Sequence, residues 1–440
     1  MKTNIELKFT FFVSVLFLAN FSFAQEILSV KQAVEIALEN NYDIKLAENN
    51  INIANENLTY GNAGFLPTVT ANLNRNNNLQ NSKQTQASGE VRSLKNAKNN
   101  SLNYGVSLGW TVFDGMGMFR RYDILKETKF RNEVELKRNV LTKVSDVITT
   151  YYTIVEQNNL LEAIESNLKI SRERVRTSEN RFEIGKASRL EVLNAQVNLN
   201  EDESQKIRIN NQIRNLKIVL NSLMVRDLSL DFEINNEVNL VEDLSLENLL
   251  NDAKNHNPDL QITAINKNIA ELELLRVKAN RYPTVRLNAG YNFAESESSL
   301  GFTTSSSSRG LNYGIAIAVN VFDGFNQKRN EQIAKLQINN STLMMEQQNL
   351  LIQTSITTLY QTYSMNLALA KIEADNVAIA KRNLEITMDK FKIGTISAVE
   401  FRDAQENYIN TISRLNAANL QTKLSELNLR EITGKIDLES

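Results

Sequence analysis

The sequence is poor in several residue types, and each scarcity excludes a class of protein. Its 440 residues include no cysteine, one histidine and three prolines. Without cysteine the chain can form neither a disulfide framework nor a Cys-ligated metal site. Its 49 basic residues nearly balance its 51 acidic residues, so no overall positive field would attract nucleic acid. We therefore expect no metal, no cofactor and no nucleic-acid partner.

The same scarcity argues against an enzyme. The one histidine, His256, stands in an Asn-rich turn before Pro258, where a solvated loop residue is the expected role. The sequence has no Ser-His-Asp grouping, phosphate-binding loop or metal-ligand spacing. We expect no catalytic residues.

Long apolar runs are also scarce, and the only substantial one lies at the N-terminus. Residues 9–19 are apolar and follow two lysines, and the small residues Ser22 and Ala24 precede Gln25. This pattern is typical of a secretory signal, predicted over residues 1–24 with cleavage near Ala24. No later segment has ~18 uninterrupted apolar residues, so a membrane protein built on spanning helices is excluded.

The mature chain repeats one unit. Motifs in its first half recur after 216 residues and later ones after 209: Asn41-Tyr42-Asp43-Ile44 with Asn257-Pro258-Asp259-Leu260, Pro67-Thr68-Val69 with Pro283-Thr284-Val285, Val112-Phe113-Asp114-Gly115 with Val321-Phe322-Asp323-Gly324, and Ala195-Gln196 with Ala404-Gln405. The seven-residue difference lies between the second and third of these motifs. We predict two tandem repeats, residues 25–240 and 241–440.

Two long stretches without glycine or proline predict long helices. Gly117 and Gly185 are separated by 67 such residues, and Gly324 and Gly394 by 69, enough for helices of about 100 Å each. Apolar residues follow heptad spacing, as in the series Leu141, Val144, Ile148, Tyr151 and Val155. The predicted helices are about 118–184 and 188–222 in the first repeat, and about 325–393 and 397–432 in the second.

Each repeat also contains one predicted β-hairpin, at about 65–113 and 283–322. Apolar or aromatic residues alternate with small or polar ones, as in Val285, Leu287, Ala289, Tyr291 and Phe293. This alternation is typical of outer-membrane barrel strands, although a soluble sheet with one buried face would share it. We expect the connecting segments, about 76–100 and 294–309, to be polar loops.

Four strands are too few to close a membrane barrel, so several copies are expected to share one. Two chains would give eight strands and three would give twelve, with room for a channel. Where strand gives way to helix, Asp114 and Asp323 are expected to cap free amides. Ser29 with Gln32 predicts a capping box that opens the first short helix.

The glycines Gly185 and Gly394 mark the predicted tips of the helical hairpins. Acidic residues follow both tips: Glu191 in the first repeat, and Glu400 and Asp403 in the second. Taken singly, each is expected on a solvated helix face. If three chains surrounded an axis with these helices inward, nine carboxylates would ring one opening and favour cations.

In their order and duplicate spacing, these motifs resemble the TolC-like outer membrane efflux proteins across essentially the whole mature chain. Besides the repeated motifs above, the match includes Arg181-Phe182-Glu183-Ile184-Gly185 and Leu193-Asn194-Ala195-Gln196. The resemblance implies a mixed α+β membrane protein: a homotrimer in the outer membrane, with four strands per chain in a shared 12-stranded barrel above a periplasmic α-barrel tunnel of coiled-coil helices. It also implies a belt built from segments near 28–57, 220–250 and the C-terminus.

The resemblance further implies partners and sites. A periplasmic adaptor and an inner-membrane pump would join the duct, and the adaptor would meet the helical tips at Ile184, Gly185, Lys186, Ile393, Gly394 and Thr395. The family's aperture acids map to Glu191, Glu400 and Asp403. The chain departs from the pattern where the best-known member closes its aperture with a hydroxylated aromatic residue and an arginine, because Phe391 and Ile396 stand there.

A coiled-coil scaffold or adhesin, secreted or periplasmic and without a channel, is the alternative. It would explain the signal and the heptads but not two hairpins with a lipid-facing pattern. Within transport, drug efflux, metal efflux and type I protein secretion share one outlet design. The sequence does not choose among them.

Overall fold

The computed structural model describes residues 27–236, 240–241, 244–299 and 303–436, so the predicted signal segment lies outside the described residues. The chain forms two compact units, each made of separate stretches. One contains the described residues up to Lys45, Lys137–Asn257 and the chain from Leu351 onward; the other contains Leu46–Leu136 and Pro258–Leu350. Each unit takes stretches from both predicted repeats, so a repeat is not a separate compact body.

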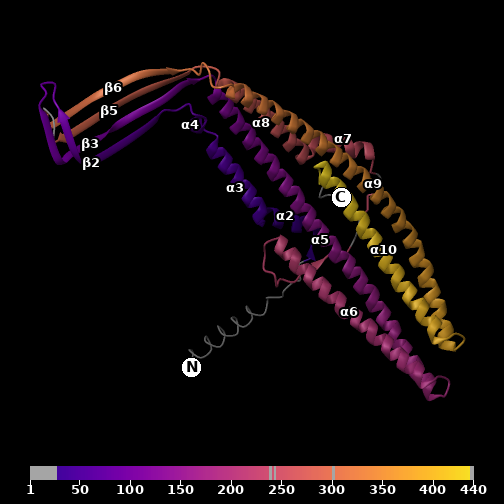
Figure 1. Ribbon diagram of the computed structural model, residues 1–440. Helices are drawn as coiled ribbons and strands as arrows, with labels where there is room; N and C mark the ends of the chain where they lie inside the picture. The colour runs from indigo at the N-terminus through magenta and orange to yellow at the C-terminus, as the bar shows by residue number, and fades with distance from the viewer. Residues whose placement is uncertain (1–26, 237–239, 242–243, 300–302, 437–440) are drawn as a thin grey trace, which may run out of the picture. The chain divides into compact units, whose positions relative to one another are not determined.

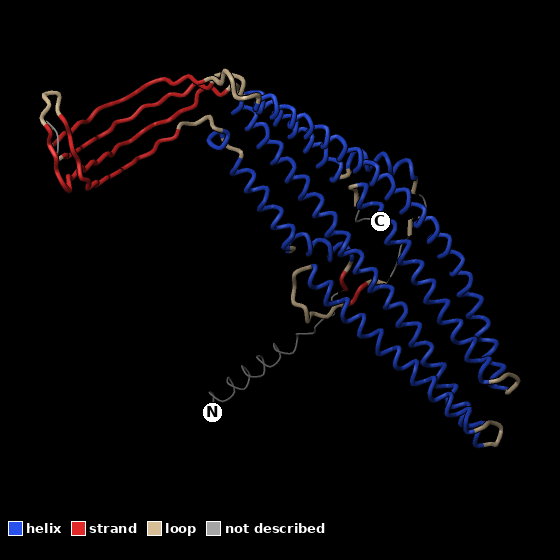
Figure 2. The backbone as a smooth tube through the Cα atoms, viewed as in Figure 1, coloured by secondary structure: helices blue, strands red, loops and turns tan. Residues whose placement is uncertain are grey.

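The second unit is built on one antiparallel sheet with strand order β2-β3-β5-β6 (Figure 1). Its strands are β2 (Thr68–Thr85), β3 (Val91–Asp114), β5 (Thr284–Ser298) and β6 (Ser305–Ala318). Helices α3 (Tyr42–Asn57), α4 (Tyr60–Ala63) and α8 (Pro258–Ala279) contribute to the same unit. Figure 2 shows the four strands running side by side in the sheet. The predicted combination of four strands and long helices is confirmed.

The pairing register places apolar and aromatic residues on one face of this sheet. Val69 lies opposite Leu108, and Tyr104 lies opposite Phe293, with ring centroids 4.7 Å apart. On β6 the same face carries side chains that are about two-thirds exposed or more: Leu311, Tyr313, Ile315 and Ile317. The opposite face is small or polar, with Ser107, Gly290 and Asn312 in one row. An exposed apolar face of this kind needs a further apolar phase or partner to cover it.

The two connecting segments predicted as polar loops are largely strand, so that prediction was wrong. In the first hairpin the ladder continues past Asn77↔Asn100 to Thr85↔Val91, with one bulge near Asn96, and only residues 86–90 form the turn. In the second, β5 reaches Ser298 and β6 starts at Ser305. The hydrogen bonds of a ladder join backbone groups, so Asn- and Ser-rich segments can continue it where both faces are polar.

The predicted aspartate caps at the strand-to-helix junctions are confirmed. The Met118 backbone N–H donates to Asp114 at 2.9 Å, and the Gln327 N–H donates to Asp323 at 2.7 Å. Asp114 also forms an ion pair with Arg121 at 2.7 Å. These caps satisfy amides at the starts of α5 (Gly117–Glu183) and α9 (Asn326–Ile393).

The first unit packs several of its helices around an apolar core. It holds α2 (Val30–Asn40), α6 (Arg189–Leu223), α7 (Leu246–His256), α10 (Ala398–Thr433) and the tip-proximal parts of α5 and α9. Buried heptad residues of α5, including Tyr151 and Val155, lie in this core. A short parallel pair, β1 (Ile27–Leu28) with β4 (Glu233–Ile234), closes one side, and Tyr151 Oη donates to Leu28 O at 3.0 Å.

The capping box at the start of α2 is confirmed. Gln32 N–H donates to Ser29 Oγ at 3.2 Å, and Ser29 N–H donates to Gln32 Oε1 at 2.9 Å. Within the described part of the chain, no helix contains a stretch that is both long and apolar enough to pass through a membrane.

Candidate aperture and helical tips

Both helical hairpins of the first unit turn with the same backbone geometry. Gly185 has φ +73°, and its N–H donates to Phe182 O at 2.9 Å; Gly394 has φ +82°, and its N–H donates to Phe391 O at 3.0 Å. Glycine is the residue that adopts this left-handed conformation without steric cost. The residues flanking both glycines are exposed, and Ile184 and Ile393 are 66% and 76% accessible. The two tips therefore present matched apolar side chains to solvent.

A serine starts the return helix after each tip and is followed by an acid. Ser188 accepts from the Glu191 N–H, and Ser397 accepts from the Glu400 N–H, both at 3.2 Å. A carboxylate in the first turn of a helix is stabilised by the helix dipole. These two predicted aperture acids therefore occupy equivalent positions in the two repeats and also have a role in helix initiation.

The three predicted aperture acids differ in their surroundings. The Glu191 side chain is only 20% exposed and lies 3.6 Å from Arg181, measured between Oε1 and Nη1. Glu400 and Asp403 are exposed on α10. The acid of the first hairpin is thus packed into the protomer, whereas the two of the second hairpin face solvent.

Aromatic rings and arginines join the two hairpins near the tips. Phe391 and Phe401 stack with centroids 5.1 Å apart, and their cluster includes Leu384, Ala404 and the partly buried Ile396. From α5, the Arg181 guanidinium lies 5.3 Å from the Phe391 centroid, and that of Arg174 lies 5.8 Å from the Phe401 centroid. Phe391 and Ile396, which depart from the family pattern, therefore contribute apolar packing and a cation–π contact.

Arg174 is buried among charged residues of both signs. Its Nη2 donates to Ala398 O at 3.2 Å, which ties α5 to the start of α10. Burial lowers the pKa of Arg174, and the positive charge of Arg402 lowers it further, while Glu191 and Asp202 act in the opposite direction. The nearby acids therefore offset part of the cost of burying this guanidinium among the packed helices.

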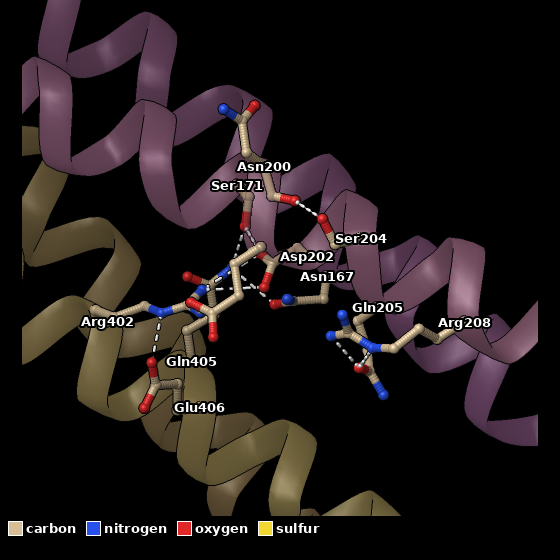
Figure 3. A network of polar contacts seen from close by, with 11 residues as sticks. Asn167, Ser171, Asn200, Asp202, Ser204, Gln205, Arg208, Arg402, Gln405 and Glu406 are labelled. Atoms are coloured by element: carbon tan, nitrogen blue, oxygen red, sulfur yellow. Dashed lines mark hydrogen bonds and ion pairs between the residues drawn. The ribbon is translucent and has the colours of Figure 1, made fainter.

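A second contact between the hairpins is a buried polar network, shown in Figure 3. Asp202 on α6 accepts from Ser171 at 2.5 Å and from Arg402 Nη1 at 3.2 Å, while Arg402 Nε donates to Glu406 at 2.6 Å. Gln405 donates to both Asn167 and Ser171 at 2.7 Å and is fully buried. The network joins residues about 200 positions apart in sequence and links α5 and α6 to α10.

The sequence patterns did not predict this network. One signal was available, because Ser171 interrupts a heptad series otherwise made of Leu161, Ile164, Leu168 and Val175. A hydroxyl in an apolar seam requires a buried hydrogen-bond partner. The identity of that partner, Asp202, follows only from the packing of the helices.

Comparison with known proteins identifies the family. The family model described as "Outer membrane efflux protein" matches residues 33–224 and 249–435, and the chain belongs to this family. The chain is 22% identical over 424 residues to the probable efflux pump outer membrane protein TtgC of Pseudomonas putida, covering 92% of this chain and 83% of TtgC. It has the same identity and coverage with a toluene efflux pump outer membrane protein, also named TtgC, from another strain.

Solved structures show the same fold. The CmeC outer membrane channel of Campylobacter jejuni aligns with a TM-score of 0.74 at 18% identity, covering 93% of this chain and 87% of that one. The open-state MtrE outer membrane channel of Neisseria gonorrhoeae aligns with a TM-score of 0.71 at 17% identity, covering 92% and 89%. These relatives are channels and efflux ducts, not enzymes.

The chain is therefore an outer-membrane exit duct of an efflux system, with a helical tunnel in the periplasm. The family match sets aside the alternative of a scaffold or adhesin without a channel.

Proposed function

We propose that three copies of this chain close one 12-stranded barrel and form a passive duct that performs no chemistry. The observation that carries this proposal is the four-stranded sheet with an exposed apolar face and with β2 and β6 as outer strands. In lipid, an unpaired strand edge leaves backbone groups without hydrogen bonds, at several kcal/mol each. Three chains supply twelve strands and an interior wide enough for a channel.

The trimer can be tested by measuring the native mass of detergent-extracted protein from an outer-membrane fraction. We expect the mass of three chains, because a single four-stranded sheet cannot satisfy its edges in lipid. A monomer that stays in solution without detergent would contradict both the shared barrel and the membrane assignment of the apolar face.

We further propose that the helical tips dock a periplasmic adaptor, which couples the duct to an inner-membrane pump. The exposed residues at the tips are Ile184, Gly185, Lys186, Ile393, Gly394 and Thr395. Two exposed isoleucines on turns of matched geometry suit a small apolar contact with a partner. The energy for transport comes from the pump, and the pump determines whether a drug, a metal or a protein is exported.

The proposed aperture ring consists of Glu191, Glu400 and Asp403 from each copy. Replacing all three with alanine is expected to reduce the preference for cations over anions and to change conductance, because nine carboxylates would be lost from one constriction. Single-channel recording in planar bilayers under a salt gradient measures both quantities. Exposed Glu400 and Asp403 should contribute more than Glu191, whose charge is partly neutralised by Arg181.

A suitable control is Glu247→Ala, because Glu247 is an exposed acid in the first turn of α7 and lies outside the proposed ring. It likewise removes a carboxylate from the first turn of a helix. If the triple variant and this control have the same reversal potential, the three acids do not line the aperture.

A further inference from the structure

The strand registers and the end of β6 indicate how the outer strands of neighbouring copies pair. The two hairpins have equivalent registers. Val69 pairs with Leu108 in the first hairpin, and the residues 216 and 209 positions later, Val285 and Ile317, pair in the second. The same holds for Ala71↔Val106 and Leu287↔Ile315. Strand pairing in this protein therefore follows the sequence repeat.

A second observation concerns where β6 ends. By the repeat, β3 and β6 should end at equivalent positions, yet β3 continues to Asp114 while β6 stops at Ala318. The last residues of β3, from Trp110 onward, pair only with β5, since the ladder with β2 ends at Thr68↔Gly109. Strand β6 has no β5 equivalent beside it, because it is the last strand in the order β2-β3-β5-β6.

The segment that follows β6 is correspondingly uncovered. Val319, Val321 and Phe322 are 53%, 92% and 74% exposed, whereas Trp110 and Val112, the equivalents of the first two, are 37% and 38% exposed. Apolar residues with strand-like alternation and no partner strand mark the place where a further strand belongs.

The repeat also identifies that strand. Strand β5, which pairs with the end of β3, corresponds to β2 in the first repeat. Because β2 is the open strand at the other edge of the sheet, the occupant that fits beside β6 is β2 of a second copy. The two strands would run antiparallel, like every other neighbouring pair in the sheet.

We infer that β6 of one copy pairs with β2 of the next in the register of the β3–β5 ladder, so that Ile317 lies opposite Leu73 and Ala318 opposite Asn72. This inference rests on the proposed shared barrel and adds its register. The register follows from the observed pairs Leu108↔Ala289 and Gly109↔Asn288 when the β3 residue is moved forward by 209 positions and the β5 residue is moved back by 216. In the assembled barrel, residues 319–323 extend β6 as strand, with Phe322 opposite Val69 of the neighbour.

The natural absence of cysteine makes this register directly testable by disulfide formation. Two double variants carry the matched pairs: Leu73→Cys with Ile317→Cys on the apolar face, and Asn72→Cys with Ala318→Cys on the polar face. In an antiparallel ladder, opposite residues on one face form hydrogen-bonded pairs and those on the other face form non-hydrogen-bonded pairs, which lie closer together. Because the two double variants lie on different faces, at least one of them has geometry suited to a disulfide. Oxidation in outer membranes is expected to yield reducible species of two and three chains on a denaturing gel.

Two controls bracket the result. Leu108→Cys with Ala289→Cys occupies the equivalent positions within one chain and should form an intramolecular disulfide without a change in mass. Leu73→Cys with Leu311→Cys is offset by six residues, about 20 Å along the strands, and should not cross-link.

The outcomes separate this inference from the trimer itself. Cross-linked chains from either matched pair, and none from the offset pair, support the register. Cross-linking of the offset pair alone, or of no pair in protein with the native mass of a trimer, overturns the register and leaves the trimer standing. A native mass of one chain overturns both.

Discussion

Replacing Arg402 with alanine is expected to loosen the contact between the two helical hairpins by about 3 kcal/mol or more. Its side chain is 12% exposed and pairs with Asp202, whose side chain is 9% exposed. Removing one partner leaves a buried charge without compensation, which typically costs about 3–5 kcal/mol. Amides of α6 near Asp202 and of α10 near Arg402 should then exchange hydrogen roughly 100-fold faster or more, as measured by mass spectrometry.

Arg208→Ala is the matched control, because Arg208 lies on α6, the helix of Asp202, and donates to Gln205 three residues earlier, in an exposed position. Exposed contacts of this kind contribute less than about 1 kcal/mol, so exchange should barely change. Adding Asp202→Ala to the Arg402 variant should recover part of the loss, because it removes the uncompensated charge. Equal exchange in the Arg402 and Arg208 variants would show that the network does not hold the hairpins together.

Gly394→Pro, and equally Gly185→Pro, is expected to abolish export while the native mass stays unchanged. Proline fixes φ near −65°, whereas these glycines have φ +82° and +73°, so the tip must adopt another path. The substitution also removes the Gly394 N–H that donates to Phe391 O. Accumulation of a fluorescent efflux substrate in cells that contain the natural pump measures export.

Two milder substitutions show whether the effect belongs to the tip. In Gly394→Ala the added Cβ would lie 3.8 Å from Arg181 Nη2, which is an ordinary contact. The substitution therefore adds mainly backbone strain, about 1–2 kcal/mol, and should weaken export only partly. Gly89→Pro makes the same change at φ +84° in the turn between β2 and β3 and should leave export intact. Loss of trimers in the tip variants would instead assign those glycines a purely architectural role.

The features that the sequence predicted well are those determined by neighbours along the chain. The heptad spacing around Tyr151, the capping box at Ser29 and the aspartate caps at Asp114 and Asp323 each depend on residues within about one or two turns. The repeated motifs added long-range information, because two copies of a hairpin must share one design. The apolar face of the sheet could be assigned because alternation is also a pattern among neighbouring residues.

The features that were missed depend on pairing between distant residues. Nothing near Asp202 in sequence indicates that its partner is Arg402, since the two meet only after α6 and α10 pack together. The continuation of β2 and β3 through Asn77 and Asn100 was missed because their side chains have low strand propensity. In the proposed pairing, the early end of β6 reflects a partner strand that a single chain does not contain.

The polar extension of the first hairpin has a consequence for how it tolerates substitution. From Asn77↔Asn100 to Thr85↔Val91 its order comes from a backbone ladder, and its β2 side chains are almost all exposed. A ladder of this kind places few demands on side-chain identity. Substitutions of the exposed β2 side chains in this extension are therefore expected to leave the ladder intact.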